Sequence, residues 1–156
     1  MSTVAKGKTI AWFRNDLRIQ DNILLSEAKE CFKKGDEILC LYCFDPSHFS
    51  KTPFQSTKSH KYRTRFLIES VMNLRENLKS IQSDLLIAYG KPEDIIPTIL
   101  QGDQKVRVLV QNEPAYEEKL VEKRAVEVGN IFSLGTKYST PFDLKYKSEL
   151  EVQTLF

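Results

Sequence analysis

EILCLYCF, residues 37 to 44, is an apolar run that opens on a single acidic residue. The run is continuous rather than alternating, which is typical of a strand buried on both faces of a parallel sheet. Parallel strands need a crossover between them, and that crossover is usually a helix. This stretch therefore predicts an α/β fold, and we expect the flanking sequence to alternate between helices and strands.

The flanking sequence does alternate. Four further strand-like runs are present, at residues 9–13, 85–89, 106–110 and 131–134. Helix-like segments separate them along the chain. The resulting βαβαβαβαβ order predicts a five-stranded parallel sheet of order 3-2-1-4-5, Rossmann-like, with helices on both faces.

The helices carry recognisable start and stop signals. The longest has a stripe of apolar residues with a period of 3.6, formed by Leu67, Val71, Leu74, Leu78 and Ile81. Asp21 or Asn22 is expected to cap the helix over 22–34, and Gly35 to end it. Pro97 is expected to kink or restart the helix that begins near Pro92.

Composition limits the class of protein. The chain has 156 residues, 41% of them hydrophobic, and a net charge of +2, which suits one domain without a strong basic field for nucleic acid. No apolar run approaches the roughly 20 residues that span a bilayer, and the N-terminus lacks the apolar core of a signal peptide. We expect no membrane partner.

Three cysteines do not suggest a disulfide framework. Their odd number favours an intracellular, reducing compartment, without distinguishing cytoplasm, nucleus and organelle. Cys40 and Cys43 form a CxxC pair inside the strand-like run, where residues i and i+3 point to opposite faces. A redox pair belongs at a helix start, so both thiols are interpreted as core residues.

The chain divides into three regions. Residues 1–8 are expected to be a disordered N-terminus, and residues 9–135 form the α/β domain. Residues 136–156 have no clear period and no core of their own. We interpret that tail as an interdomain arm or linker.

The fold also predicts where a ligand binds. In such sheets the crevice lies outside the carboxyl ends of the strands, where strand order reverses, here between the first and fourth strands. Its walls would be residues 14–21, 45–59 and 111–118. No GxGxxG follows the first strand, and the turn after the fourth strand is acidic, which disfavours phosphate.

No catalytic or metal constellation emerges from the residues. His48 and His60 are too far apart for a helical metal pair, and no serine sits in a nucleophile elbow. Asp45 suits a ribose contact or an Asx-type turn before Pro46. Arg14, Asp16, Arg18 and Asp21 lie together after the first strand. Either they form a structural ion-paired loop or they contact a ligand or another domain.

Several segments resemble the photolyase and cryptochrome family, most closely its cryptochrome DASH branch. They are WFRNDLRIQDN (12–22), LYCFDPSHF (41–49), KYRTRFLIESVMNLRENL (61–78), SDLLIAYGKPEDIIP (83–97) and NEPAYEEKLVEKRAVE (112–127). PFDL and LEVQTLF in the tail continue the resemblance. It covers roughly residues 9 to 156 in order and rests on several independent motifs.

The resemblance implies an antenna role. In the family this domain helps to hold a light-harvesting chromophore, usually 5,10-methenyltetrahydrofolate and sometimes a deazaflavin or flavin. A folate site needs an apolar slot and a carboxylate or amide facing the pterin edge. The candidates at matching positions are Gln111, Asn112, Glu113, Tyr116, Glu117, His48 and Phe49.

The resemblance also implies partners. FAD and damaged DNA are bound in the family by a helical domain that this chain does not contain. That domain is the expected partner, in cis or in trans, and this chain alone is not expected to repair DNA. An assembled form would resemble a deoxyribodipyrimidine photolyase. Two alternatives remain: a stand-alone nucleotide- or pterin-binding protein, and an interaction module for a helical partner.

Overall fold

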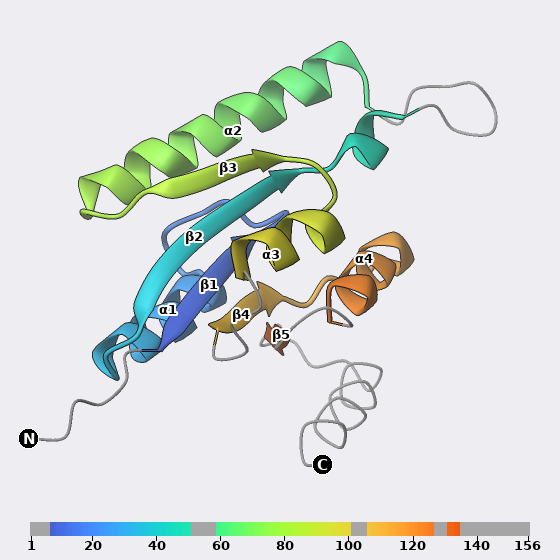
Figure 1. The fold of residues 1–156 in the computed structure, drawn as a ribbon. Coiled ribbons are helices and arrows are strands. Elements are labelled where there is room, and N and C mark those ends of the chain that lie inside the picture. The colour runs from blue at the N-terminus through green and yellow to red at the C-terminus, as the bar shows by residue number, and fades with distance from the viewer. Residues whose placement is uncertain (1–6, 51–58, 101–105, 127–130, 135–156) are drawn as a thin grey trace, which may run out of the picture.

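A parallel sheet forms the centre of the molecule. The computed structural model describes residues 7–50, 59–100, 106–126 and 131–134. The strands are β1 (Lys8–Phe13), β2 (Glu37–Phe44), β3 (Leu85–Tyr89), β4 (Val106–Gln111) and β5 (Ile131–Leu134). They lie side by side in the order β3-β2-β1-β4-β5, and every neighbouring pair is parallel (Figure 1). The α/β class with a parallel sheet is confirmed.

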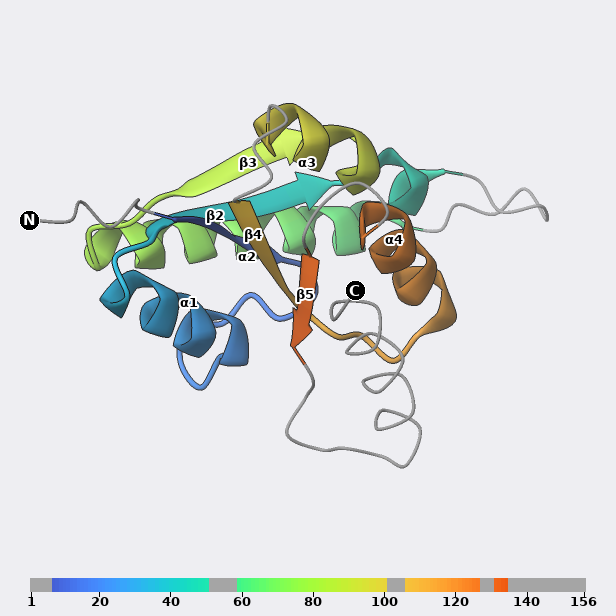
Figure 2. The ribbon, with the colours of Figure 1, turned by 60° about the horizontal axis from the view of Figure 1, so that its bottom comes forward.

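In the described ranges, four α-helices cover the two faces of the sheet. They are α1 (Ile23–Lys33), α2 (Lys61–Ser80), α3 (Pro92–Leu100) and α4 (Tyr116–Val126), and a 3-10 helix, η1 (Pro46–Phe49), follows β2. The helices α1 and α2 lie on one side of the sheet, and α3 and α4 lie on the other (Figures 1 and 2). Crossovers of this kind are what a parallel sheet requires.

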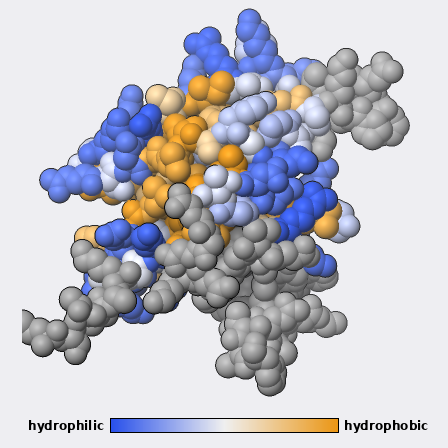
Figure 3. Space-filling view, viewed as in Figure 1, coloured by the Kyte–Doolittle hydropathy of each residue, from blue (hydrophilic) through white to orange (hydrophobic). Residues whose placement is uncertain are grey.

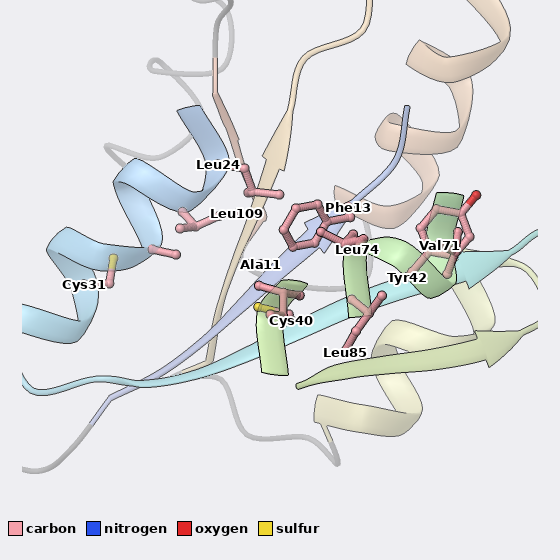
Figure 4. Packing of buried hydrophobic residues seen from close by; sticks show 12 residues of the cluster. Ala11, Phe13, Leu24, Cys31, Cys40, Tyr42, Val71, Leu74, Leu85 and Leu109 are labelled. Atoms are coloured by element: carbon pink, nitrogen blue, oxygen red, sulfur yellow. The ribbon is translucent and has the colours of Figure 1, made fainter. Parts of the chain in front are cut away.

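Each face of the sheet has its own hydrophobic core. Phe13 of β1 packs with Leu24 of α1 and Leu74 of α2 in one cluster (Figure 4). Trp12, the neighbour of Phe13 on β1, belongs to the cluster on the opposite face, under α3 and α4. Burial on both faces explains why the central strands are continuous apolar runs.

The cysteines lie where the strand geometry predicts. Cys40 packs in the cluster under α1 and α2, and Cys43 packs in the cluster under α3 and α4. Cys31 of α1 is also buried, and all three are free thiols. Burial raises the pKa of Cys40, and it raises the pKa of Cys43 to about 12. A thiol with a raised pKa is a poor nucleophile, which suits core residues.

Several local predictions are decided by the structure. Asn22, not Asp21, caps α1, because the Asn22 side-chain oxygen accepts a hydrogen bond from the Leu25 N–H at 3.2 Å. Asp21 instead adopts a left-handed conformation with φ 49°. Pro97 lies inside α3, so the prediction of a restart there is wrong: the segment is one helix. The first strand begins at Lys8, one residue earlier than predicted.

Some predictions fall outside the described residues. These are the disorder of residues 1–6 and the linker character of residues 136–156. Within the part of the chain that the structure describes, no helix is both long and apolar enough to cross a bilayer.

The N-cap gives a first prediction. We expect Asn22→Ala to lower the free energy of unfolding by about 1–2 kcal/mol, because the buried amide joins α1 to the loop before it. The same amide donates to the Arg18 carbonyl at 2.9 Å. Urea denaturation followed by circular dichroism measures the change.

Asp21→Gly is the matched control for that variant. Glycine adopts positive φ without strain, so the free energy of unfolding of the Asp21→Gly variant should stay within about 0.5 kcal/mol of the wild-type value. A larger loss for Asp21→Gly than for Asn22→Ala would contradict the assignment of the cap.

Candidate functional site

One cleft lies over the carboxyl ends of β1 and β2. Its volume is about 670 Å³, within the range of roughly 300–1,000 Å³ typical of ligand sites. We call it the first cleft. Its lining comes from the strand ends, the loops that follow them and the first turns of three helices: Trp12, Phe13, Arg14, Asn15, Tyr42, Cys43, Asp45, His48, Phe49, Ser59, Arg63, Phe66, Leu67, Pro92, Glu117, Glu118 and Val121.

The first cleft is not the crevice that was predicted between β1 and β4. It opens over β1 and β2, between the starts of α2 and α4, rather than between β1 and β4. The crevice expected between β1 and β4 corresponds to a second cleft, which Gln111 and Glu113 line together with residues 15–18 after β1. The carboxyl end of the sheet is nevertheless the correct edge.

The second cleft lies on the other side of the loop after β1, which comprises residues 14–18. Residues 15–18, the middle of α2, Gln111 and Glu113 line it. Most of these groups are polar, and Phe66 and Leu67 border both clefts. The chain thus presents two neighbouring clefts, one on each side of residues 14–18.

The predicted site residues divide between the two clefts. His48, Phe49 and Glu117 line the first cleft, and Gln111 and Glu113 line the second. Tyr116 and Asn112 line neither, so the structure does not bring them to either cleft. The Tyr116 side chain points into solvent from the start of α4. The Asn112 side-chain oxygen is buried, and no described hydrogen-bond donor reaches it.

The charged loop after β1 is held by two separate sets of contacts. The Arg18 guanidinium donates two hydrogen bonds to the Asp16 carboxylate in a bidentate ion pair, with both N···O distances at 2.9 Å. That hydrogen bonding lowers the pKa of Asp16. Both residues are near solvent, so the pair contributes little to stability. Asp21 lies close enough to favour the charged form of Arg18.

Arg14 makes contacts of a different kind. Its guanidinium reaches across to α4, where Nη2 donates to the Glu118 carbonyl at 3.0 Å and Nη1 lies 3.8 Å from Glu122 Oε2. Its carbon Cζ lies 5.3 Å from the centre of the Trp12 ring. Burial lowers the pKa of Arg14, while Glu122, Glu113 and Glu118 oppose that shift. Arginine remains charged in proteins, so this is a buried cation surrounded by acids.

Asp45 has a structural role in this chain. Its side chain accepts a hydrogen bond from the Ser47 N–H at 2.8 Å and so caps η1. This is the Asx-type turn that the Asp-Pro sequence predicts. The alternative, a ribose contact, would compete with that hydrogen bond. In the described ranges, no group of three or more His, Cys, Asp or Glu residues is placed to hold a metal ion.

Glu113 is an acid of the second cleft whose pKa lies above its ordinary value. Burial raises its pKa, while hydrogen bonds from Asn15 and the charge of Arg14 oppose the shift. A half-buried carboxylate at a cleft wall suits a ligand edge that donates hydrogen bonds. The acids around it make the same wall unfavourable for phosphate.

The raised pKa predicts a specific pH dependence. The folded state binds the Glu113 proton more tightly than the unfolded state, so this residue makes stability fall as pH rises from its ordinary pKa of 4.5 through the raised value. We expect Glu113→Gln to gain stability relative to the wild type over that interval and to hold the gain at higher pH. Urea midpoints at several pH values between about 4 and 7 measure it. A difference that does not change with pH would contradict the assignment.

A twisted parallel sheet with helices on both faces defines a doubly wound α/β domain, a class in which ligands bind at the carboxyl edge of the sheet. The DNA photolyase family model matches residues 9–130. The chain therefore belongs to the DNA photolyase family, of which it represents the N-terminal α/β region.

Curated relatives agree with that assignment. The chain is 40% identical over 114 residues to cryptochrome DASH of Gloeobacter violaceus, covering 73% of this chain and 22% of that protein. It is also 40% identical over 134 residues to "Cryptochrome DASH, chloroplastic/mitochondrial" of Arabidopsis thaliana, covering 83% and 23%. The chain thus spans about a quarter or less of these two relatives.

Solved structures show the same fold. A cryptochrome of Synechocystis sp. PCC6803 superposes with a TM-score of 0.71 at 33% identity, covering 86% of this chain and 28% of that one. An archaeal photolyase from Sulfolobus tokodaii, solved with two FAD molecules, superposes with a TM-score of 0.67 at 20% identity, covering 82% and 28%. The second likeness shows the fold alone.

Proposed function

We propose that this chain is the antenna-type α/β domain of a cryptochrome DASH or photolyase-like blue-light flavoprotein. Its role is to hold a light-harvesting chromophore beside a helical FAD domain. The observation that carries the proposal is the pair of clefts at the carboxyl edge of the sheet in a chain that belongs to this family. Light harvesting needs a bound chromophore but no proton transfer by the protein.

The second cleft supports a donor-bearing heterocycle as the ligand. Glu113 offers a half-buried carboxylate, and Gln111 offers an amide next to it. The pterin ring of 5,10-methenyltetrahydrofolate has an edge of N–H donors that such groups recognise. Phe66 and Leu67, which border both clefts, offer an apolar surface to the ring. We infer that Glu113 and Gln111 bind the folate edge.

The first cleft supports the flavin alternative. Trp12, Phe13 and Phe49 give it an aromatic lining, which suits a flat ring system. The Sulfolobus photolyase was solved with two FAD molecules and was taken to imply a novel light-harvesting cofactor. Glu117 and Glu118 on the α4 wall, however, disfavour the phosphates of FAD. On that ground the folate is the favoured ligand.

The helical FAD domain is proposed as the partner, in cis or in trans. DNA would then be contacted only through that domain. In the family the folate also contacts the helical domain, so this chain would supply only part of the folate site. We propose that the chain alone has no repair activity and that an assembled form acts as a flavin-dependent lyase.

A binding experiment tests the proposed ligand. The purified 156-residue chain would be mixed with 5,10-methenyltetrahydrofolate, and separately with FAD. Each mixture would be measured with and without the helical domain of a cryptochrome DASH. We expect a near-UV folate band that stays with the protein through gel filtration. Retention of neither compound, with or without the helical domain, would overturn the proposal.

A variant tests the assigned carboxylate. Glu113→Gln should weaken folate binding by about tenfold or more, since a hydrogen bond to a charged group is worth about 1.5–3 kcal/mol. Glu76→Gln, an exposed acid of α2 outside both clefts, is the matched control and should bind as the wild type does. Retention of FAD but not folate would favour the first cleft as the site.

A further inference from the structure

The helix α4 forms one wall of the first cleft, through Glu117, Glu118 and Val121. Its apolar attachment to the sheet is small. Among the side chains of α4 that the structure describes, Ala125 is buried in the core and Val121 is only partly buried. The surface over α4 is predominantly hydrophilic (Figure 3). Hydrophobic burial alone therefore gives the first half of this helix little to fix its position.

Arg14 supplies a directional attachment at that point. Its guanidinium donates to the Glu118 carbonyl and pairs with the Glu122 carboxylate, and these two residues are one helical turn apart. The Trp12 ring lies against the guanidinium. The strand end, the aromatic ring and the first half of α4 thus meet at one side chain.

This pair is far more buried than the ion pair that joins α4 to α3. The side chains of Arg14 and Glu122 are 9% and 2% exposed. The pair that joins α4 to α3, Arg124 with Glu93, has an arginine that is 59% exposed and lies in the last turn of α4. Burying two charges costs desolvation, and apolar side chains of similar volume often give equal or greater stability. A buried pair is therefore better explained by the geometry that it fixes than by stability.

We propose that Arg14 is a positioning residue that fixes the first half of α4 through Glu118 and Glu122 and thereby sets the shape of the first cleft. The link to ligand binding rests on the proposed function, whereas the link to the position of α4 does not. Phosphate or carboxylate recognition by Arg14 is disfavoured, because Glu113, Glu118 and Glu122 already surround it.

A double variant separates positioning from stability. Arg14→Met alone leaves the buried Glu122 carboxylate without this cation, so it should lower the melting temperature markedly. Combining it with Glu122→Met replaces the ion pair by apolar side chains, and we expect most of the lost melting temperature to return. Arg18→Met is the matched control, since Arg18 belongs to the same loop and pairs near solvent.

Hydrogen exchange gives a readout that needs no ligand. In the double variant, the amides of residues 120–125 should exchange about tenfold faster than in the wild type, while those of residues 71–78 stay unchanged. Trp12, the only tryptophan, should become more accessible to acrylamide. Unchanged exchange in α4 together with unchanged Trp12 quenching would overturn the proposal.

A second variant covers the case in which the double variant does not fold. Arg14→Lys keeps the charge but removes the planar fork that contacts two groups of α4 at once. Like the double variant, Arg14→Lys should speed amide exchange in residues 120–125 and increase the quenching of Trp12 by acrylamide. Wild-type behaviour of a folded Arg14→Lys protein would show that the charge alone suffices, which also overturns the proposal.

Ligand binding forms a separate arm of the experiment. If the wild type binds FAD or 5,10-methenyltetrahydrofolate in the first cleft, the double variant should bind it about tenfold more weakly. If the wild type binds neither, the proposed function fails, and the exchange data still decide the role of Arg14. Wild-type affinity in a folded double variant with loosened α4 would show that the cleft does not depend on this helix.

Discussion

Phe13→Ala should lower the free energy of unfolding by about 3–5 kcal/mol, a large part of the stability of a domain of this size. Phe13 is 1% exposed and lies where residues from α1 and α2 meet the sheet. The smaller side chain removes apolar burial and leaves a cavity that the surrounding helices cannot fill without moving. Urea denaturation followed by circular dichroism measures the change.

Phe32→Ala is the matched control for that substitution. Phe32 is on α1 but is 67% exposed, so its loss should change stability by no more than about 0.5 kcal/mol. Similar losses for the two variants would contradict the arrangement of the core. A folded Phe13→Ala protein with wild-type stability would do the same.

Leu74→Ala should have the next largest effect, about 2–5 kcal/mol. The helix α2 has 20 residues, and its fully buried contacts with the sheet come from Val71, Leu74 and Leu78. Leu74 is the middle member of this set, so its truncation weakens the whole attachment. The unfolding transition of α2 can be followed through its helical circular dichroism signal.

Met72→Ala is the control on the same helix. Met72 lies on the outer face and is 45% exposed, so its substitution should cost less than about 1 kcal/mol. An equal cost at both positions would mean that α2 is rotated relative to the described structure.

The strands could be predicted from the sequence because their signal is local. Continuous apolar runs at 37–44 and 85–89 become β2 and β3 with the same bounds, and the first and fourth strands each extend one residue further than predicted. Burial on both faces forces such runs to be apolar throughout, so the pattern and the structure share one cause.

The partner of Arg14 could not be predicted in the same way. Glu122 lies far along the chain among Glu118, Lys119 and Lys123, where a surface helix is the ordinary interpretation. Glu122 points inward only because α4 packs against the end of β1. The local sequence pattern of α4 does not indicate that orientation. The short-range pair of Asp16 and Arg18, by contrast, agrees with the predicted ion-paired loop.

The grouping of the candidate ligand residues was even harder to predict from the sequence. Segments after β2 and β4 were predicted to share one crevice, but the loop after β1 divides the edge into two clefts. The direction that this loop takes depends on Arg14 and Asn15 reaching α4 and Glu113. Those contacts are tertiary, so residue types and spacing alone could not assign Gln111 and His48 to different clefts.

The central place of β1 has a consequence for synthesis of the chain. During synthesis β1 can pair with β2 on one side before β4 is available to pair with its other side, where Lys8 lies opposite Val106. Until then the nascent sheet keeps an unpaired apolar edge, which is a template for association with other chains. Messages truncated between β3 and β4 should therefore yield aggregates, whereas release after β4 should yield a chain in which both edges of β1 are paired.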